Sequence, residues 1–239
     1  MSSRSGSLVI AIVGAESTGK TALAAALAER VASETGLRCS WVPEHLRAWC
    51  DAAGRTPRPD EQAAIAAAPR DSIEAAAATY AVVLADTTPL MTAVYSRLLF
   101  ADDSLTLDAA AWHRRCALTL LTALDLPWVA DGLQRDGPQV REPVDTEVRQ
   151  LLMRHRLPWA LVGGAGDERV DNALDALAPM LRTLAAPRCG LFTRLGQRNA
   201  SDRPWLCSDC DDPDCEHRVF NADGGADAGG TSGADRSAY

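Results

Sequence analysis

An eight-residue loop between an apolar run and a helical pattern constrains this chain more than any other feature of its sequence. Residues 14–21 read Gly-Ala-Glu-Ser-Thr-Gly-Lys-Thr and fit the pattern G-x-x-x-x-G-K-[ST] at every fixed position. The apolar run 8–13 before the loop predicts a strand that is buried on both faces. After the loop, Leu23, Leu27 and Val31 recur at the spacing of one helix face. A strand, this loop and a helix in that order predict a P-loop, in which backbone N–H groups bind phosphates.

Lys20 is the only lysine of the chain, whose other 23 basic side chains are arginines. Its compact ammonium can reach between the β- and γ-phosphates of a nucleotide, where a planar guanidinium fits poorly. We therefore expect a nucleoside triphosphate to bind here, with the Thr21 hydroxyl as a ligand of Mg²⁺. The expected nucleotide-binding residues of the loop are Gly14, Ala15, Glu16, Ser17, Thr18, Gly19, Lys20 and Thr21.

Length and charge narrow the class of protein. At 239 residues the chain has room for one α/β core and an appendage. Its net charge of −8 argues against nucleic-acid or membrane-surface partners, because no long basic stripe is present to neutralise phosphates. No stretch approaches the about 18 consecutive apolar residues of a membrane span. We expect a cytoplasmic protein whose seven cysteines stay reduced.

Strand patterns and helix patterns alternate along residues 1–185, and this alternation predicts the fold. Four further apolar runs predict strands at 39–43, 80–85, 126–130 and 159–162. Helical patterns cover 20–35, 61–79 with an interruption at Pro69, 89–99, 106–124, 144–156 and 168–184. Strands that alternate with helices form parallel sheets covered on both faces. We expect a three-layer α/β P-loop NTPase fold with a five-stranded parallel sheet in the order 2-3-1-4-5.

Acidic residues follow two of the predicted strands at the edge where open α/β sheets place their sites. Asp86 could hold Mg²⁺ opposite Thr21, although the segment 86–88 could also cap the helix that follows it. Glu44 could accept a proton from an attacking hydroxyl, and Arg47 could hold a phosphate or orient that base. An acid at a helix N-terminus with a surface ion pair explains Glu44 and Arg47 equally well.

Two loops at the same edge carry arginines. Residues 131–141 follow the predicted fourth strand and include Arg135 and Arg141, which suits a lid over the γ-phosphate or an ordinary solvated loop. Residues 163–169 end at Arg169 and could line a nucleotide-binding adenine pocket, although plain turn chemistry also explains their glycines.

Five segments, in order and each at a strand end, resemble the kinase domain of NadR-type proteins, the nicotinamide-riboside kinase branch of P-loop ATPases. They are residues 14–21, 43–47, 84–88, 128–135 and 162–169, and the resemblance covers about 8–184. It implies that ATP phosphorylates the ribosyl 5′-hydroxyl of nicotinamide riboside. The implied site has Lys20 and Thr21 at the phosphates, Asp86 near Mg²⁺, Glu44 and Arg47 facing the substrate, and Arg135 and Arg141 in the lid.

Two functions are compatible with these motifs. The first is a kinase that uses ATP and Mg²⁺ on a small nucleoside-like substrate, with Lys20, Glu44, Asp86, Arg135 and Arg141 as catalytic residues. The second is a regulatory ATPase or nucleotide-dependent binding module without a small-molecule acceptor. An acidic side chain of Glu44 that points into an open cavity favours the kinase, whereas a cavity filled by side chains favours the module.

The C-terminal part of the chain carries a separate pattern. Within residues 186–220, Cys207, Cys210, Cys215 and His217 offer three thiolates and an imidazole, with Cys189 as a possible substitute for His217. Such ligands suit a tetrahedral structural Zn²⁺, although unligated cysteines on a mobile segment are the alternative. Residues 221–239 are rich in Gly, Ala, Asp and Ser and are expected to be disordered.

Metal analysis tests the zinc site directly. Protein purified under reducing, chelator-free conditions should carry about one zinc per chain. Because a structural site draws its folding energy from the metal, chelation should unfold residues near 200–220 and leave nucleotide binding largely intact. Protein without zinc under these conditions would contradict the assignment, and a Cys207→Ser, Cys210→Ser double variant should lose the metal.

Overall fold

The computed structural model describes residues 6–129 and 137–184. All described residues belong to one compact unit. The predicted zinc ligands Cys189, Cys207, Cys210, Cys215 and His217 lie outside the described residues, as does Arg135. No helix in the described ranges is both long and apolar enough to cross a membrane.

A five-stranded parallel sheet forms the centre of the molecule, and its order β2-β3-β1-β4-β5 confirms the prediction. β1 pairs with β3 on one side and with β4 on the other, so that Ile12 lies beside Asp86 and Val13 beside Leu121. The strands are β1 (Leu8–Val13), β2 (Cys39–Val42), β3 (Val82–Asp86), β4 (Leu118–Thr122) and β5 (Trp159–Val162).

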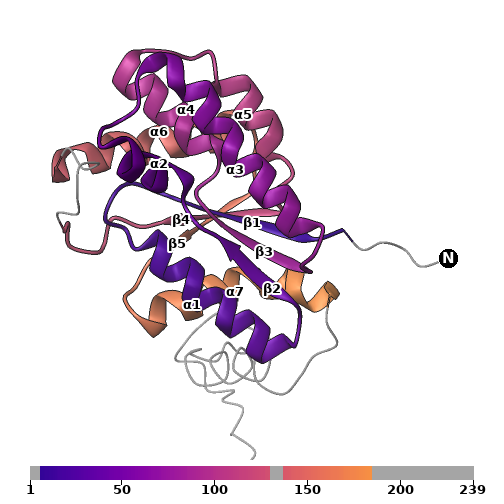
Figure 1. Ribbon diagram of the computed structural model, residues 1–239. Coiled ribbons are helices and arrows are strands. Elements are labelled where there is room, and N and C mark those ends of the chain that lie inside the picture. Colours follow the sequence, from indigo (N-terminus) through magenta and orange to yellow (C-terminus); the bar gives the residue numbers. More distant parts are fainter. Residues whose placement is uncertain (1–5, 130–136, 185–239) are drawn as a thin grey trace, which may run out of the picture. The chain divides into compact units, whose positions relative to one another are not determined.

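Helices cover both faces of the sheet, which gives three layers (Figure 1). They are α1 (Lys20–Thr35), α2 (His45–Ala53), α3 (Gln62–Ala77), α4 (Pro89–Phe100), α5 (Thr106–His113), α6 (Arg141–Arg154) and α7 (Asp167–Leu184), with 3₁₀ turns η1 (Pro59–Glu61) and η3 (Pro138–Val140). α1 ends where Gly36 adopts φ 71°, a left-handed conformation, and its N–H bonds the Ala32 carbonyl oxygen. α3 runs through Pro69 without a break, because Ile65 and Ile73 on the same face remain buried against neighbouring elements.

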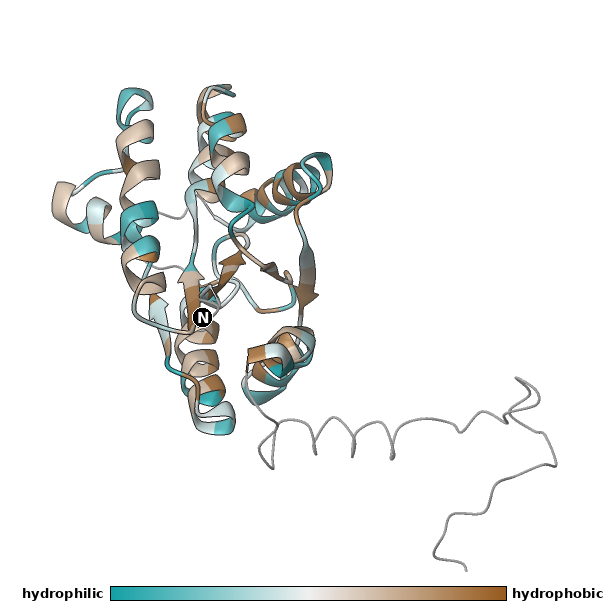
Figure 2. Cartoon of the chain, turned by 90° about the vertical axis from the view of Figure 1, so that its right-hand side faces the viewer, coloured by the Kyte–Doolittle hydropathy of each residue, from teal (hydrophilic) through white to brown (hydrophobic). Residues whose placement is uncertain are grey.

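Two hydrophobic cores lie on opposite faces of the sheet because successive strand residues point to opposite sides. On one face, Ile10 and Ile12 pack with α1 and α7; on the other, Val9, Ala11 and Val13 pack with α3, α4, α5 and α6. Figure 2 shows mostly hydrophobic strands between helices that carry both hydrophobic and hydrophilic residues. β1 is therefore buried on both faces, as its uninterrupted apolar run predicts.

The fourth strand is not where the sequence pattern predicts it. β4 spans Leu118–Thr122, inside the segment 106–124 that reads as one helix, and the described residues 126–129 form no strand. A short apolar run of this kind cannot be assigned to helix or strand from its spacing alone. Thr119 and Thr122 are tolerated in this buried strand because both hydroxyls are hydrogen-bonded, to His113 and to Thr18 and the Val13 carbonyl.

His113 links two elements inside the protein. Its side chain is fully buried, with Nδ1 3.0 Å from Thr88 Oγ1 and Nε2 2.7 Å from Thr119 Oγ1. Burial lowers the pKa of His113 to about 4, because the charged imidazolium is poorly solvated there. This position gives His113 a structural role.

Acidification should destabilise the protein through His113. Below its ordinary pKa of 6.5 the unfolded chain binds a proton that the folded chain binds only near pH 4. The free energy of unfolding should therefore fall between these values, by about 1.4 kcal/mol per pH unit. Urea unfolding at pH 7 and pH 5 measures this dependence of the unfolding free energy on pH. The His113→Gln variant should lose the dependence, whereas the control variant His45→Gln should retain it. An unchanged slope in His113→Gln would contradict the assignment.

Candidate active site

The P-loop lies between β1 and α1, as its motif predicts, and its conformation is determined by the end of β4. Gly14 has φ 149°, and a Cβ at this position would overlap Thr122 Oγ1, so that no larger residue fits. Thr18 is buried, and its Oγ1 donates to the Ala15 carbonyl oxygen at 2.8 Å and lies 2.6 Å from Thr122 Oγ1. The Thr18 hydroxyl therefore stabilises the loop from inside.

Arg169 connects the P-loop to the loop after β5. Its side chain is 4% exposed, and it donates from Nη1 to the Thr18 carbonyl oxygen at 2.9 Å and from Nε to the Gly164 carbonyl oxygen at 2.7 Å. Nη2 pairs with Asp125, whose other carboxylate oxygen accepts from the Gly164 N–H at 2.6 Å. These bonds give Arg169 a role in holding the loop, and direct nucleotide contact stays a prediction.

Thr122 and Asp125 were not expected as site residues. Both depend on the true position of β4: the predicted helix over 106–124 would include Thr122 as one of its residues and would place Asp125 just after the helix, before the predicted strand 126–130, and not after a strand end. The sequence feature that could have identified these two site residues is a pair of threonines within an apolar run, followed by an acid and a turn.

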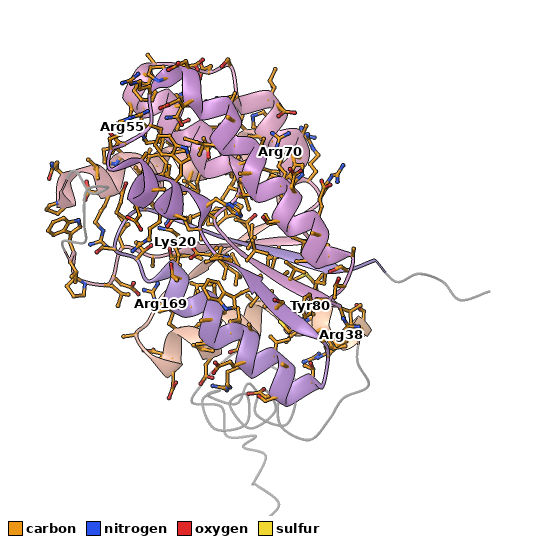
Figure 3. All side chains as sticks on the ribbon, viewed as in Figure 1. Lys20, Arg38, Arg55, Arg70, Tyr80 and Arg169 are labelled. Carbon is orange, nitrogen blue, oxygen red and sulfur yellow. The ribbon has the colours of Figure 1, made fainter. Side chains whose placement is uncertain are left out.

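Lys20, Thr21 and Asp86 converge at the start of α1. Thr21 Oγ1 donates to Asp86 Oδ2 at 2.5 Å, and Lys20 Nζ donates to the Ala15 carbonyl oxygen at 2.8 Å. Figure 3 shows Lys20 and Arg169 at one end of the sheet, with Arg38 and Tyr80 at the other. The structure thus brings together the residues expected at the phosphates and at the Mg²⁺ ion.

Asp86 has the properties of a metal-binding carboxylate. It is 2% exposed, and its Oδ1 is buried without a hydrogen-bond partner among the described residues. Burial raises its pKa, while the Thr21 hydrogen bond and the charges of Lys20 and Arg47 oppose the shift. The next residue, Thr87, has φ 66°, a strained conformation for a β-branched side chain. An unpartnered carboxylate oxygen beside a threonine hydroxyl fits a Mg²⁺ ion.

An open cavity of about 650 Å³ adjoins the P-loop. Glu16, Lys20, Glu44 and Arg47 line it together, and Arg47 Nε lies 3.8 Å from Glu44 Oε2. Burial raises the pKa of Glu44, with Asp86 and Glu16 adding to the shift and Lys20 and Arg47 opposing it. Both Glu44 and Arg47 therefore face the same cavity, as expected from their spacing at the start of α2.

The lid prediction is only partly within the described residues. Arg141 does not lie in a loop: it is the first residue of α6, is 8% exposed, and continues the buried face of Val144 and Val148. Its Nε and Nη2 have no hydrogen-bond partner in the described part of the chain. Gln139 and Val140 of η3 line the cavity instead. Roles of Arg135 and Arg141 in catalysis stay predictions.

Residues 6–129 and 137–184 contain no group of three or more His, Cys, Asp or Glu side chains that could hold a metal ion. Thr21 and Asp86, the predicted magnesium ligands, supply two oxygen donors, and their role as a metal site stays a prediction. That arrangement agrees with the preference of Mg²⁺ for retaining water and binding nucleotide phosphates.

Comparison with known proteins gives a consistent result. Residues 9–169 match the sequence family described as an AAA domain. A crystal structure of NadR protein in complex with NR has a TM-score of 0.56 at 20% identity, covering 72% of this chain and 50% of that one. NadR protein in complex with NAD and AMP-PNP has a TM-score of 0.54 at 19% identity, covering 72% and 49%. The chain therefore spans about half the length of these NadR chains.

A third solved structure, thymidylate kinase from Ehrlichia chaffeensis, has a TM-score of 0.52 at 14% identity, covering 73% of this chain and 99% of that one. No curated protein matches the chain. The resemblance to NadR-type proteins is confirmed, and the fold is similar to that of the NadR and thymidylate kinase structures.

Asp86→Asn should test the magnesium site, because it removes the charge and keeps the shape of the side chain. We expect the Mg²⁺ concentration needed for tight nucleotide binding to rise roughly tenfold or more. Titration of MgCl₂ against a fluorescent ATP analogue measures this directly. Affinity for the metal-free nucleotide should be unchanged or higher, since a negative charge near the phosphates is lost. An unaltered Mg²⁺ dependence would exclude Asp86 from the metal site.

Proposed function

Because the chain belongs to this AAA-domain family, we propose that it is an ATP-dependent kinase of a small nucleoside-like substrate. Nicotinamide riboside is the best single acceptor, since the chain resembles NadR-type proteins in sequence motifs and in fold. The observation that carries the proposal is that Glu44 lines an open cavity together with Lys20. A carboxylate and a phosphate-binding lysine that share one cavity are the groups that a hydroxyl-directed phosphotransfer requires.

The nucleotide half of the reaction depends on the P-loop. Backbone N–H groups of residues 15–20 and the N-terminus of α1 bind the phosphate oxygens. Lys20 moves its ammonium from the Ala15 carbonyl oxygen to the β- and γ-phosphates. Thr21 and Asp86 hold Mg²⁺, which when bound neutralises charge on those phosphates. The bonds of Arg169 to the loop keep these donors in place before the nucleotide arrives.

The acceptor half of the reaction depends on Glu44. The hydroxyl oxygen of the acceptor attacks the γ-phosphorus, the bond from phosphorus to the β–γ bridging oxygen breaks, and ADP leaves. The Glu44 carboxylate takes the hydroxyl proton, and burial makes it a stronger base by raising its pKa. Arg47, whose Nε lies 3.8 Å from Glu44 Oε2, orients that carboxylate. Most of the rate enhancement comes from positioning and charge neutralisation.

The open cavity also bears on the second candidate, a regulatory ATPase or binding module. Such a module needs no acceptor site, and side chains would be expected to fill the space beside the P-loop. The cavity of about 650 Å³ falls in the usual range for small-molecule sites, roughly 300–1,000 Å³. This favours the kinase. A panel of nucleosides tested for ADP release and for a phosphorylated product separates the two functions.

Glu44→Gln is the sharpest test of the kinase mechanism. We expect kcat to fall about 10²–10⁴-fold with little change in ATP affinity, because the amide cannot accept the proton. Coupled ADP release and isothermal titration with ATP measure the two quantities. Asp51→Asn, which removes a charge from the same cavity wall two turns further along α2, should have a small effect. If kcat falls equally in both variants, or does not fall in Glu44→Gln, Glu44 is not the base.

A further inference from the structure

Two largely buried polar side chains line the cavity without a hydrogen-bond partner among residues 6–129 and 137–184. Gln62, the first residue of α3, is 4% exposed, and Thr92 on α4 is 7% exposed; both line the cavity. Neither the Gln62 amide nor the Thr92 hydroxyl makes a hydrogen bond to another residue of the described ranges, and neither is a fully enclosed polar group, so both can be reached from the cavity. Polar groups that open onto a cavity can bond to water or to a bound molecule.

Gln62 differs in polarity from the rest of its buried helix face, and Thr92 differs from the buried Ser96 beside it in having no hydrogen-bond partner in the described part of the chain. The buried face of α3 continues from Gln62 through Ile65, Pro69 and Ile73, all apolar. On α4, Thr92 shares its buried face with Ser96 one turn further on, but the Ser96 hydroxyl donates to Asp102 Oδ2 at 3.3 Å. A leucine or a valine would suit either position better if packing were the only requirement. The polar groups are therefore best explained by a bound molecule.

The backbone at Gln62 is held in place from outside the cavity. The Arg55 guanidinium pairs with both carboxylate oxygens of Glu61, at 2.7 and 2.6 Å, and Glu61 Oε2 also accepts from the Arg58 N–H at 2.8 Å. Arg55 also lies over the Trp49 ring, 5.1 Å from its centroid. The residue immediately before Gln62 is thus anchored by several contacts, so the amide is positioned before any ligand binds.

We propose that Gln62 and Thr92 form a recognition subsite for the acceptor, which binds a group that carries a hydrogen-bond donor and an acceptor side by side. A glutamine amide offers one donor group and one acceptor atom, and the threonine hydroxyl can do either. A carboxamide on a flat ring, or the hydrogen-bonding edge of a nucleobase, has the complementary chemistry. The apolar side chains of Leu98, Phe100, Val140 and Val144 supply walls for that ring. This inference rests on the proposed kinase function, with Glu44 at the reacting hydroxyl.

Protein stability separates a ligand-binding role from a structural one. Gln62→Leu removes an amide that bonds no other residue of the described ranges, so its melting temperature should equal or exceed that of the wild type. The same holds for Thr92→Val. Matched controls are Gln150→Leu and Thr146→Val, the same chemical changes at exposed positions on α6. A clear loss of stability in Gln62→Leu alone would mean that the amide supports the fold, and the proposal would be wrong.

Matched acceptors test the recognition itself. Nicotinamide riboside is compared with its 3-acetylpyridine analogue, in which a methyl group replaces the amide NH₂, and adenosine with purine riboside, which lacks the amino group. In the wild type, KM for whichever parent is phosphorylated should be roughly ten- to hundredfold lower than for its analogue. Gln62→Leu should lose this discrimination while KM for ATP stays unchanged, and Gln150→Leu should keep it.

The outcomes distinguish this proposal from the function on which it rests. If the wild type phosphorylates no nucleoside, the kinase proposal fails and the subsite fails with it. If a nucleoside is phosphorylated but Gln62→Leu raises KM equally for parent and analogue, the kinase stands and the subsite is rejected. If Gln62→Leu no longer discriminates between parent and analogue while its ATP affinity is unchanged, both the kinase proposal and the subsite proposal are supported.

Discussion

The burial of β1 on both faces, between β3 and β4, determines where every functional group lies. Its register places Ile12 beside Asp86 and Val13 beside Leu121, so that the P-loop leaves the sheet between two strand ends. Thr21 then meets Asp86, and Thr18 meets Thr122. A shift of β1 by one residue would exchange its two hydrophobic faces and separate both pairs. The apolar cores on each side of the sheet therefore stabilise the geometry of the site as well as the fold.

The two halves of the site are built differently. Around the P-loop, Arg169 bonds the Thr18 and Gly164 carbonyls and pairs with Asp125. On the acceptor side, burial raises the pKa of Glu44, and the Gln62 amide has no partner among the described residues. The P-loop is held by hydrogen bonds within the protein, whereas the acceptor side holds polar groups that a bound molecule would stabilise.

The features that the sequence predicts best are those that depend on short, local patterns of residues. The P-loop, the order of the strands and the position of Asp86 follow from a motif, from apolar runs and from the rule that sites lie at strand ends. β4 was misplaced because an apolar run of five residues fits a helix as well as a strand, and Thr122 and Asp125 were missed with it. The cavity could not be predicted either, since Gln62, Thr92 and Val140 come from three elements that only tertiary packing brings together.

The absence of lysine outside the P-loop has a chemical consequence. Lys20 carries the only side-chain primary amine of all 239 residues, and it lines the cavity beside Glu44. Reagents that acylate amines therefore have one side-chain target, and its reactivity reports whether the phosphate site is occupied. For the same reason, acetylation of a lysine in this chain would remove the charge that the P-loop uses, so any such modification would act on the site itself.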